Sequence, residues 1–193
     1  MNWILFDYGN VLSLAQPAAD AEAMAGAAGA DPVAFRSRYW QHRLEFDGGS
    51  LSPADYWTRV AGRPLGGAEV ARLIDMDVAS WAHPDEGTVT LLGELLAAGR
   101  DVALLSNAPA CVADGLDELP WIAGIPRRFY SGRLGLVKPG RQIYDLVARE
   151  LGAAPARVVF VDDRPENVAG AEAAGMTGVR FTGADALREV LRP

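Results

Sequence analysis

The side chains in this sequence best suited to chemistry are carboxylates that directly follow apolar runs. The first is Asp7, which comes after Trp3-Ile4-Leu5-Phe6 and before a turn through Gly9. A short apolar run of this kind is typical of a buried strand, and the turn then delivers the carboxylate to the rim of a sheet. We interpret Asp7 as a nucleophile. On this stretch alone, an aspartate that only begins a turn explains the pattern equally well.

Further polar residues lie just past later apolar runs or at the start of a predicted helix. They are Ser106, Asn107, Lys138, Asp162, Asp163 and Asn167. Taken singly, a Ser-Asn pair is typical of a turn, a Lys-Pro pair of the surface and adjacent aspartates of a helix cap. Ligands of open parallel sheets bind outside the carboxyl ends of the strands. All of these residues can therefore converge on Asp7 in one site.

Such a set of residues is suited to phosphoryl transfer. An ionised aspartate needs no general base to attack, and carboxylates form covalent phosphoryl intermediates. Attack on a phosphate dianion brings like charges together, and Asp162 and Asp163 add to the repulsion. Mg²⁺ relieves it because it binds carboxylate, carbonyl and phosphate oxygens. Lys138 adds a compact positive charge, and Ser106 and Asn107 can hold phosphoryl oxygens.

The elements that must position these residues follow an alternating pattern of strands and helices. Strands are predicted at residues 3–6, 102–105, 127–130, 158–161 and 179–181. Helices between them are predicted to end near Gly99, Leu119, Gly152, Ala174 and Leu191. Continuous apolar strands separated by helices indicate an α/β fold, with a parallel sheet covered on both faces.

A helical block separates the first strand from the others. Its helices are predicted at residues 18–29, 33–46, 53–61 and 67–81. We therefore predict an insertion at residues 14–83 in a core made of residues 1–13 and 84–193. Its aromatic stripe is interpreted as core: Phe35, Tyr39, Trp40 and Phe46. The basic residues of the block could either reach a substrate or form solvated surface, and we favour solvated surface for each: Arg36, Arg38, His42, Arg43 and Arg59.

Four motifs together resemble those of the haloacid dehalogenase superfamily of hydrolases. They are Phe6-Asp7-Tyr8-Gly9-Asn10-Val11, Leu105-Ser106-Asn107, Val137-Lys138-Pro139 and Val161-Asp162-Asp163 with Asn167. They occur in the family's order, and the resemblance spans the whole chain, including a helical cap after the first motif. It implies a Rossmann-like, doubly wound sheet of strand order 3-2-1-4-5. It also implies a phosphatase that forms an aspartyl-phosphate on a small phosphorylated metabolite.

The resemblance also implies a role for each motif residue. Asp7 is the nucleophile and binds Mg²⁺ together with the Gly9 carbonyl and the Asp163 carboxylate. The residues that it assigns to phosphate binding are Ser106, Asn107 and Lys138. The residues that it assigns to supporting the lysine and the metal-bound waters are Asp162 and Asn167.

One position departs from the usual pattern of phosphatases in this superfamily. They usually carry a second aspartate two residues after the nucleophile, which protonates the leaving group, and this chain has Gly9 there. Sugar-phosphate phosphatases similar to glucose-1-phosphatase share this feature. A different proton donor, a good leaving group or low activity would each accommodate the change. General acid–base help is typically worth about 10²- to 10⁴-fold.

Two other functions are compatible with these motifs. A 2-haloacid dehalogenase uses the same nucleophile on carbon without Mg²⁺. In such an enzyme, however, the negative charge of the paired carboxylates would oppose binding of a carboxylate substrate. A catalytically weak binding protein is the other alternative, because of Gly9.

Composition narrows the range of partners and cofactors. The net charge of −7 offers no basic face for nucleic acid. The single cysteine excludes an internal disulfide, and one cysteine with two histidines offers no Cys/His zinc cluster. The chain starts directly with a strand and has no apolar run of membrane-spanning length. We expect a cytoplasmic monomer or homodimer.

Overall fold

Five short apolar segments form a parallel sheet in the computed structural model, which describes residues 2–191. The strands are β1 (Trp3–Phe6), β2 (Val102–Ser106), β3 (Arg127–Tyr130), β4 (Val158–Asp162) and β5 (Thr177–Arg180). Their order across the sheet is β3-β2-β1-β4-β5, and every neighbouring pair is parallel. This confirms the predicted α/β class and the order that the family resemblance implies. The first strand is central, so its carboxyl end is flanked by those of β2 and β4.

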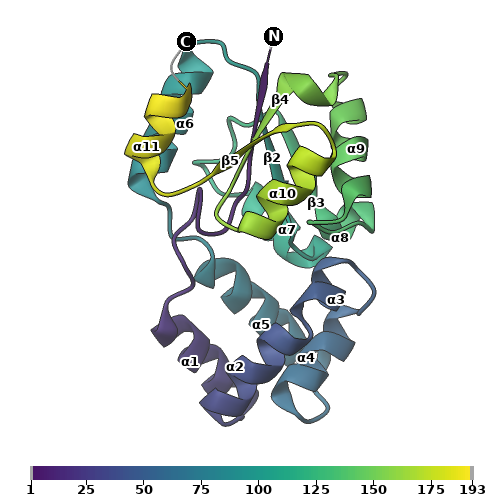
Figure 1. The fold of residues 1–193 in the computed structure, drawn as a ribbon. Helices are drawn as coiled ribbons and strands as arrows, with labels where there is room; N and C mark the ends of the chain where they lie inside the picture. Colours follow the sequence, from purple (N-terminus) through teal and green to yellow (C-terminus); the bar gives the residue numbers. More distant parts are fainter. Residues whose placement is uncertain (1, 192–193) are drawn as a thin grey trace.

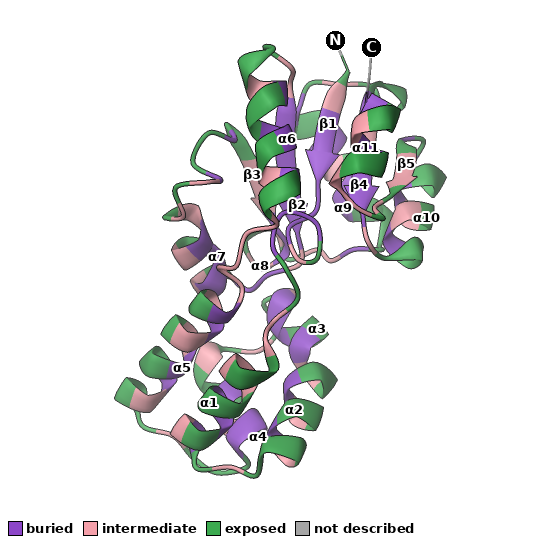
Figure 2. Cartoon of the chain, turned by 90° about the vertical axis from the view of Figure 1, so that its left-hand side faces the viewer, coloured by how far each residue is buried: buried purple, intermediate pink, exposed green. Residues whose placement is uncertain are grey.

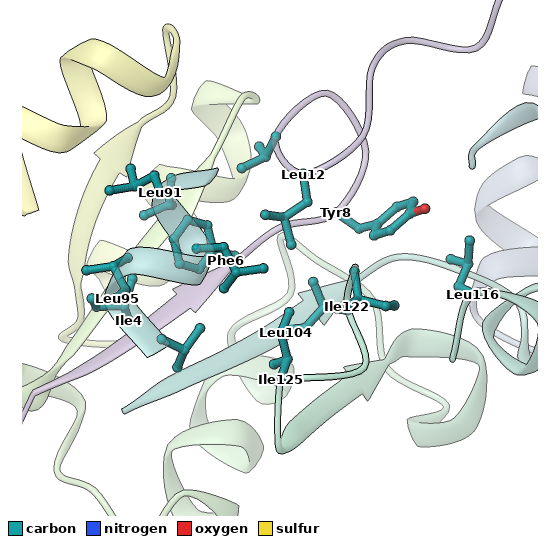
Figure 3. Packing of buried hydrophobic residues seen from close by; sticks show 14 of the residues in the cluster. Ile4, Phe6, Tyr8, Leu12, Leu91, Leu95, Leu104, Leu116, Ile122 and Ile125 are labelled. Atoms are coloured by element: carbon teal, nitrogen blue, oxygen red, sulfur yellow. The ribbon is translucent and has the colours of Figure 1, made fainter. Parts of the chain in front are cut away.

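Helices cover both faces of this sheet (Figure 1). They are α6 (Glu86–Ala97), α7 (Ala110–Asp117), α8 (Ser131–Leu134), α9 (Arg141–Glu150), α10 (Pro165–Ala173) and α11 (Ala184–Leu191), with a 3₁₀ turn at Pro155–Arg157. Side chains alternate along a strand, so Ile4 and Phe6 pack toward α6 and α11, whereas Leu5 packs toward α9 and α10. Figure 3 shows Ile4 and Phe6 against two leucines of α6. Strands that are buried on both faces read as continuous apolar runs for this reason.

The inserted helices form a second lobe, which we call the helical lobe. Its members are α1 (Ala18–Ala28), α2 (Pro32–Gln41), α3 (Arg43–Asp47), α4 (Pro53–Ala61) and α5 (Gly67–Ser80). The lobe has a hydrophobic core of its own, in which Phe35, Tyr56 and Trp57 are buried. Figure 2 shows α5 lying beside α7 and α3 lying beside α8. None of the described helices combines the length and apolar character needed to cross a membrane.

Most predicted elements are present, but the prediction of one continuous helix in the helical lobe is wrong. The stretch 33–46 was predicted as one helix, and it forms two, because the chain leaves helical geometry at His42 (φ −105°, ψ 1°). The break turns Arg43 inward, where its guanidinium meets Tyr39 and Asp77. The apolar period that continues through the break carries no sign of this turn.

The chain crosses between the lobes twice, and the two crossings lie side by side. Leu14 N–H donates to the His83 carbonyl (2.7 Å), and Asp85 N–H donates to the Leu12 carbonyl (3.0 Å). We propose that the inserted unit begins and ends at this paired crossing, as the boundaries at residues 14–83 imply. A double connection of this kind restricts how far the helical lobe can move from the sheet.

Candidate active site

The carboxyl end of β1 delivers Asp7 to the centre of the sheet edge. Phe6 pairs with Leu104 of β2 and with Val161 of β4, and Asp7 N–H continues the ladder with a 2.8 Å bond to the Val161 carbonyl. Ser106 and Asp162 are the last residues of β2 and β4 and therefore reach the same edge. The parallel register thus gathers residues that lie far apart in the sequence, as predicted.

Lys138 is clamped between two buried carboxylates. Its Nζ lies 2.6 Å from Oδ1 of Asp7 and 2.7 Å from Oδ2 of Asp162, and the residue is only 2% exposed. Burial opposes a charged lysine, yet the two carboxylates outweigh it and raise the pKa of Lys138. Burial also raises the pKa of Asp7, and Lys138 opposes that rise. The arrangement places a fixed positive charge beside the candidate nucleophile.

Asp162 is held by a set of donors beneath the site. Its oxygens accept hydrogen bonds from Asn167 Nδ2 (3.0 and 3.1 Å) and from the Arg164 N–H (2.8 Å). With Lys138 on Oδ2 as well, both oxygens of this buried carboxylate are engaged. Asp162 and Asn167 thus lie where residues that orient the lysine must lie.

Three carboxylates converge in a way that suits a divalent cation. One oxygen from each of Asp7, Asp162 and Asp163 lies within 4.8 Å of the others. Burial, with the charge of Asp162 adding to it, raises the pKa of Asp163, and the charges of Lys138 and Arg164 only partly oppose that rise. Its one hydrogen bond from a side chain comes from Asn10 Nδ2 (3.2 Å) among the described residues. Hard oxygen donors at this spacing fit Mg²⁺, and Asp163 is freer to bind it than the fully engaged Asp162.

Ser106 and Asn107 differ in how far their side chains are available to a ligand. The Ser106 hydroxyl has no hydrogen-bond partner among the described residues, although the residue is only 4% exposed and lines the central cavity. Asn107 exchanges two bonds with the backbone of Lys138: Nδ2 donates to its carbonyl (3.0 Å), and Oδ1 accepts from its N–H (2.9 Å). Ser106 is therefore free to hold phosphate, whereas the Asn107 side chain fixes the lysine loop.

A cavity of about 420 Å³ opens over these residues. Its floor contains Asp7, Gly9, Ser106, Lys138 and Asp163, with Asn107 and Asn167 in the same lining. Its wall from the helical lobe is made of Trp40, Arg43, Leu44, Asp47 and Trp81. All eight residues predicted from the motifs therefore lie in or directly beneath one cavity, and its far wall comes from the inserted unit.

The prediction that Arg43 belongs to a solvated surface is wrong. Arg43 is only 7% exposed, and its guanidinium bonds Asp47 Oδ1 through Nε (2.7 Å) and Asp77 Oδ2 through Nη1 (2.9 Å). The Tyr39 hydroxyl contacts the same Nη1 and donates to Asp77 Oδ1 (2.7 Å). This network is buried at the cavity wall. Its members come from α2, α3 and α5, so no local pattern in the sequence reveals it.

Comparison with known proteins shows which family the chain belongs to. A family model described as haloacid dehalogenase-like hydrolase matches residues 1–175. The chain belongs to the haloacid dehalogenase-like hydrolases. It is 28% identical to a sesquiterpene phosphatase of Aspergillus oryzae over 180 residues. This aligned region covers 92% of this chain and 88% of that protein.

Solved structures of this hydrolase family have the same fold. An enzyme from Bacteroides thetaiotaomicron, in complex with magnesium and inorganic phosphate, covers 100% of both chains with a TM-score of 0.72 and 17% identity. An L-2-haloacid dehalogenase covers 94% of this chain and 86% of its own, with a TM-score of 0.68 and 20% identity. At these identities the likeness concerns the fold alone, so the choice of reaction rests on the residues of the site.

The sequence did not indicate several residues of this hydrolase site. Asn10, Asp47, Trp81 and Arg164 all line the cavity. Asn10 has a left-handed backbone (φ 59°), which the Tyr-Gly-Asn turn could have suggested because asparagine tolerates this region. Asp47 and Trp81 end helices of the inserted unit, and only the packing of the lobes brings them to the site.

Proposed function

We propose that this hydrolase is a Mg²⁺-dependent phosphatase that cleaves a small phosphomonoester through an aspartyl-phosphate on Asp7. The observation that carries the proposal is the Asp7–Lys138–Asp162 clamp beside Asp163. It combines a nucleophile, a fixed positive charge and an oxygen-rich cation site. We assign Mg²⁺ to Asp7, Asp163 and the Gly9 carbonyl, where it would neutralise the charge of the phosphate.

The residues of the chain then act in two steps. An oxygen of Asp7 bonds to phosphorus while the bond from phosphorus to the leaving-group oxygen breaks. Water next attacks phosphorus, and the bond to Asp7 breaks, which releases inorganic phosphate. Lys138 and the Ser106 hydroxyl hold phosphoryl oxygens throughout, and Asn107, Asp162 and Asn167 keep the lysine in place. Fixed donors of this kind need no rearrangement as charge develops.

The charge of the site favours phosphate over a haloacid. A dehalogenase must bind the carboxylate of its substrate, and here three carboxylates already converge. Without a cation they would repel a fourth, whereas a phosphate dianion arriving with Mg²⁺ turns them into ligands. The similarity to a sesquiterpene phosphatase over most of both chains supports the same choice.

The cavity wall indicates which leaving groups the site would accept. Trp40, Leu44 and Trp81 from the helical lobe and Leu116 from α7 present apolar surface above the phosphate site. We propose that the inserted unit is the specificity-determining cap of this family and that it favours an apolar leaving group. A sugar phosphate, as in the glucose-1-phosphatase-like subset, is the alternative, since tryptophan rings can also stack on sugars.

The test is release of inorganic phosphate from p-nitrophenyl phosphate with and without Mg²⁺. We expect Mg²⁺-dependent turnover that is lost in Asp7→Asn and kept in Asp75→Asn, a matched change at an exposed aspartate of α5. A panel of alkyl, prenyl and sugar phosphates then ranks leaving groups. Chloride release from a 2-haloacid without phosphatase turnover would overturn the proposal. Size-exclusion chromatography distinguishes a monomer from a homodimer, the two states that we expect.

A further inference from the structure

The cavity contains one carboxylate with no role in the proposed reaction. Asp47, at the end of α3, lines the same cavity as Asp7 and is 6% exposed. Its Oδ1 accepts a 2.7 Å bond from Arg43 Nε, and its Oδ2 receives no hydrogen bond from the residues that the structure describes. A buried carboxylate with one oxygen held and the other available is well suited to proton transfer.

The position of Asp47 is fixed relative to the phosphate site by a bond between the lobes. Its backbone carbonyl accepts a 2.6 Å bond from the Ser131 hydroxyl, which in turn accepts from the N–H of Ala108 (2.9 Å). Ala108 directly follows Ser106 and Asn107. The end of α3 is thus anchored to the loop that is proposed to hold phosphate. A general acid must keep a constant distance from the reacting oxygen, and this anchor provides that constraint.

The neighbouring carboxylate of the same network lacks this freedom. Asp77 accepts from the Tyr39 hydroxyl on Oδ1 and from Arg43 on Oδ2, is fully buried, and does not line the cavity. Arg43 and Tyr39 together thus occupy Asp77, while Arg43 engages only one oxygen of Asp47. Of the two acids in the network, Asp47 is the one that can reach a substrate.

We propose that Asp47 is the general acid and base of the reaction, replacing from the helical lobe the carboxylate that Gly9 lacks. This inference rests on the proposed phosphatase function. In the first step the Asp47 carboxyl gives its proton to the leaving-group oxygen as that oxygen departs from phosphorus. In the second step the Asp47 carboxylate takes a proton from the attacking water. The cycle restores both aspartates and yields an alcohol and hydrogen phosphate.

The electrostatic surroundings suit both halves of this cycle. Burial raises the pKa of Asp47 to about 6, and the Asp77 carboxylate of α5 adds to the rise. Arg43 of α3 and Lys138 of the core oppose it. A pKa close to the working pH allows one group to serve as acid and then as base. The ion pair with Arg43 also keeps the carboxylate oriented after it has lost its proton.

The experiment compares two leaving groups in Asp47→Asn. Hexyl phosphate departs as a strongly basic alkoxide and needs a proton, whereas p-nitrophenolate departs unaided. We expect kcat/KM for hexyl phosphate to fall about 10²- to 10⁴-fold, and kcat/KM for p-nitrophenyl phosphate to change by less than about fivefold. Because the second step loses its base, p-nitrophenol should appear as a burst of about one equivalent per enzyme. The control is Glu45→Gln, which alters an exposed carboxylate of the same helix. It should change kcat/KM for neither substrate.

The pH profile supplies a second readout. The wild-type profile of kcat/KM against pH for hexyl phosphate should have a limb near pH 6. This limb should disappear in Asp47→Asn and shift to a different pH in Asp47→Glu, the variant that keeps a carboxylate. If Asp47→Asn does not fold, Asp47→Glu still decides, because its limb should move with the new carboxyl group. Equal losses for both substrates without a burst, or an unchanged limb, would overturn the inference while the phosphatase proposal stands. If the wild-type enzyme hydrolyses neither hexyl phosphate nor p-nitrophenyl phosphate, both the inference and the phosphatase proposal are overturned.

Discussion

The indole ring of Trp81 packs against Gly9: a Cβ added to Gly9 would lie 3.2 Å from Cζ3 of Trp81. Few real Cβ contacts are this close, and a carboxylate would extend further toward the ring. Trp81 is itself held, because its Nε1 donates to the Tyr39 hydroxyl (3.2 Å) within the buried network of the helical lobe. The place where related phosphatases usually carry their second aspartate is therefore filled by a side chain of the helical lobe.

We predict that introducing an aspartate at position 9 will not supply general acid–base catalysis. Gly9→Asp must displace the Trp81 ring and with it the cavity wall, and misplacement of this order costs up to about 10²-fold in rate. We expect phosphatase kcat/KM to fall at least about tenfold. Gly93→Asp is the control, because a Cβ on this exposed glycine of α6 meets nothing within 4 Å. A rise in kcat/KM for alkyl phosphates would contradict this prediction.

Local patterns in the sequence were enough to predict the sheet and the floor of the site. The β1 run ends at Asp7 and the β4 run at Asp162, and parallel strands necessarily bring such ends to one edge. The order of the strands came from the family resemblance rather than from periodicity. A prediction built on strand ends succeeds here because backbone register, rather than side-chain packing, fixes these positions.

The wall of the site could not be predicted in the same way. Arg43 and Asp77 are 34 residues apart and meet only when α3 packs against α5. Asp47 reads as an ordinary residue before a Gly-Gly break, and its cavity position depends on Ser131, which lies 84 residues further along. Long-range packing between lobes leaves no periodic signal, so these residues read as surface.

Lys138 should be essential for stability as well as for activity. Lys138→Met leaves Asp7 and Asp162 buried without their shared cation, and breaking a buried pair of this kind typically costs about 3–5 kcal/mol. Urea denaturation should show a loss of this size in the free energy of unfolding. Arg141→Met is the matched control, because its pair with Asp145 is exposed (68% and 48%) and such pairs are worth about 0–1 kcal/mol. Equal effects in the two variants would rule out the clamp as a source of stability.

The Ser131 bond between the lobes should contribute to both stability and catalysis. Ser131→Ala leaves the Asp47 carbonyl and the Ala108 N–H without this partner in a buried position, which typically costs about 1–3 kcal/mol. Turnover of alkyl phosphates should fall more than that of p-nitrophenyl phosphate, because only the former depends on the position of Asp47. Ser50→Ala removes an exposed bond to the Glu45 carbonyl and should have little effect on either measurement.

Leu44 should set the preference for apolar leaving groups. It is 57% exposed and lines the cavity beside Trp40, so a bound apolar chain would cover surface that now faces water. Removing most of this side chain in Leu44→Ala forfeits part of the about 1.5–3 kcal/mol that full burial of a leucine provides. We expect kcat/KM for hexyl phosphate to fall on the order of fivefold, with methyl phosphate unchanged.

Val33 offers a matched control for Leu44, because it is also exposed in the helical lobe (80%) but lies outside the cavity over Asp7. Val33→Ala should leave both substrates unaffected. A loss that is equal for hexyl and methyl phosphate in Leu44→Ala would mean that the residue supports the fold of the wall rather than contacts the substrate. A selective gain on sugar phosphates in the same variant would instead place the polar leaving group against this wall.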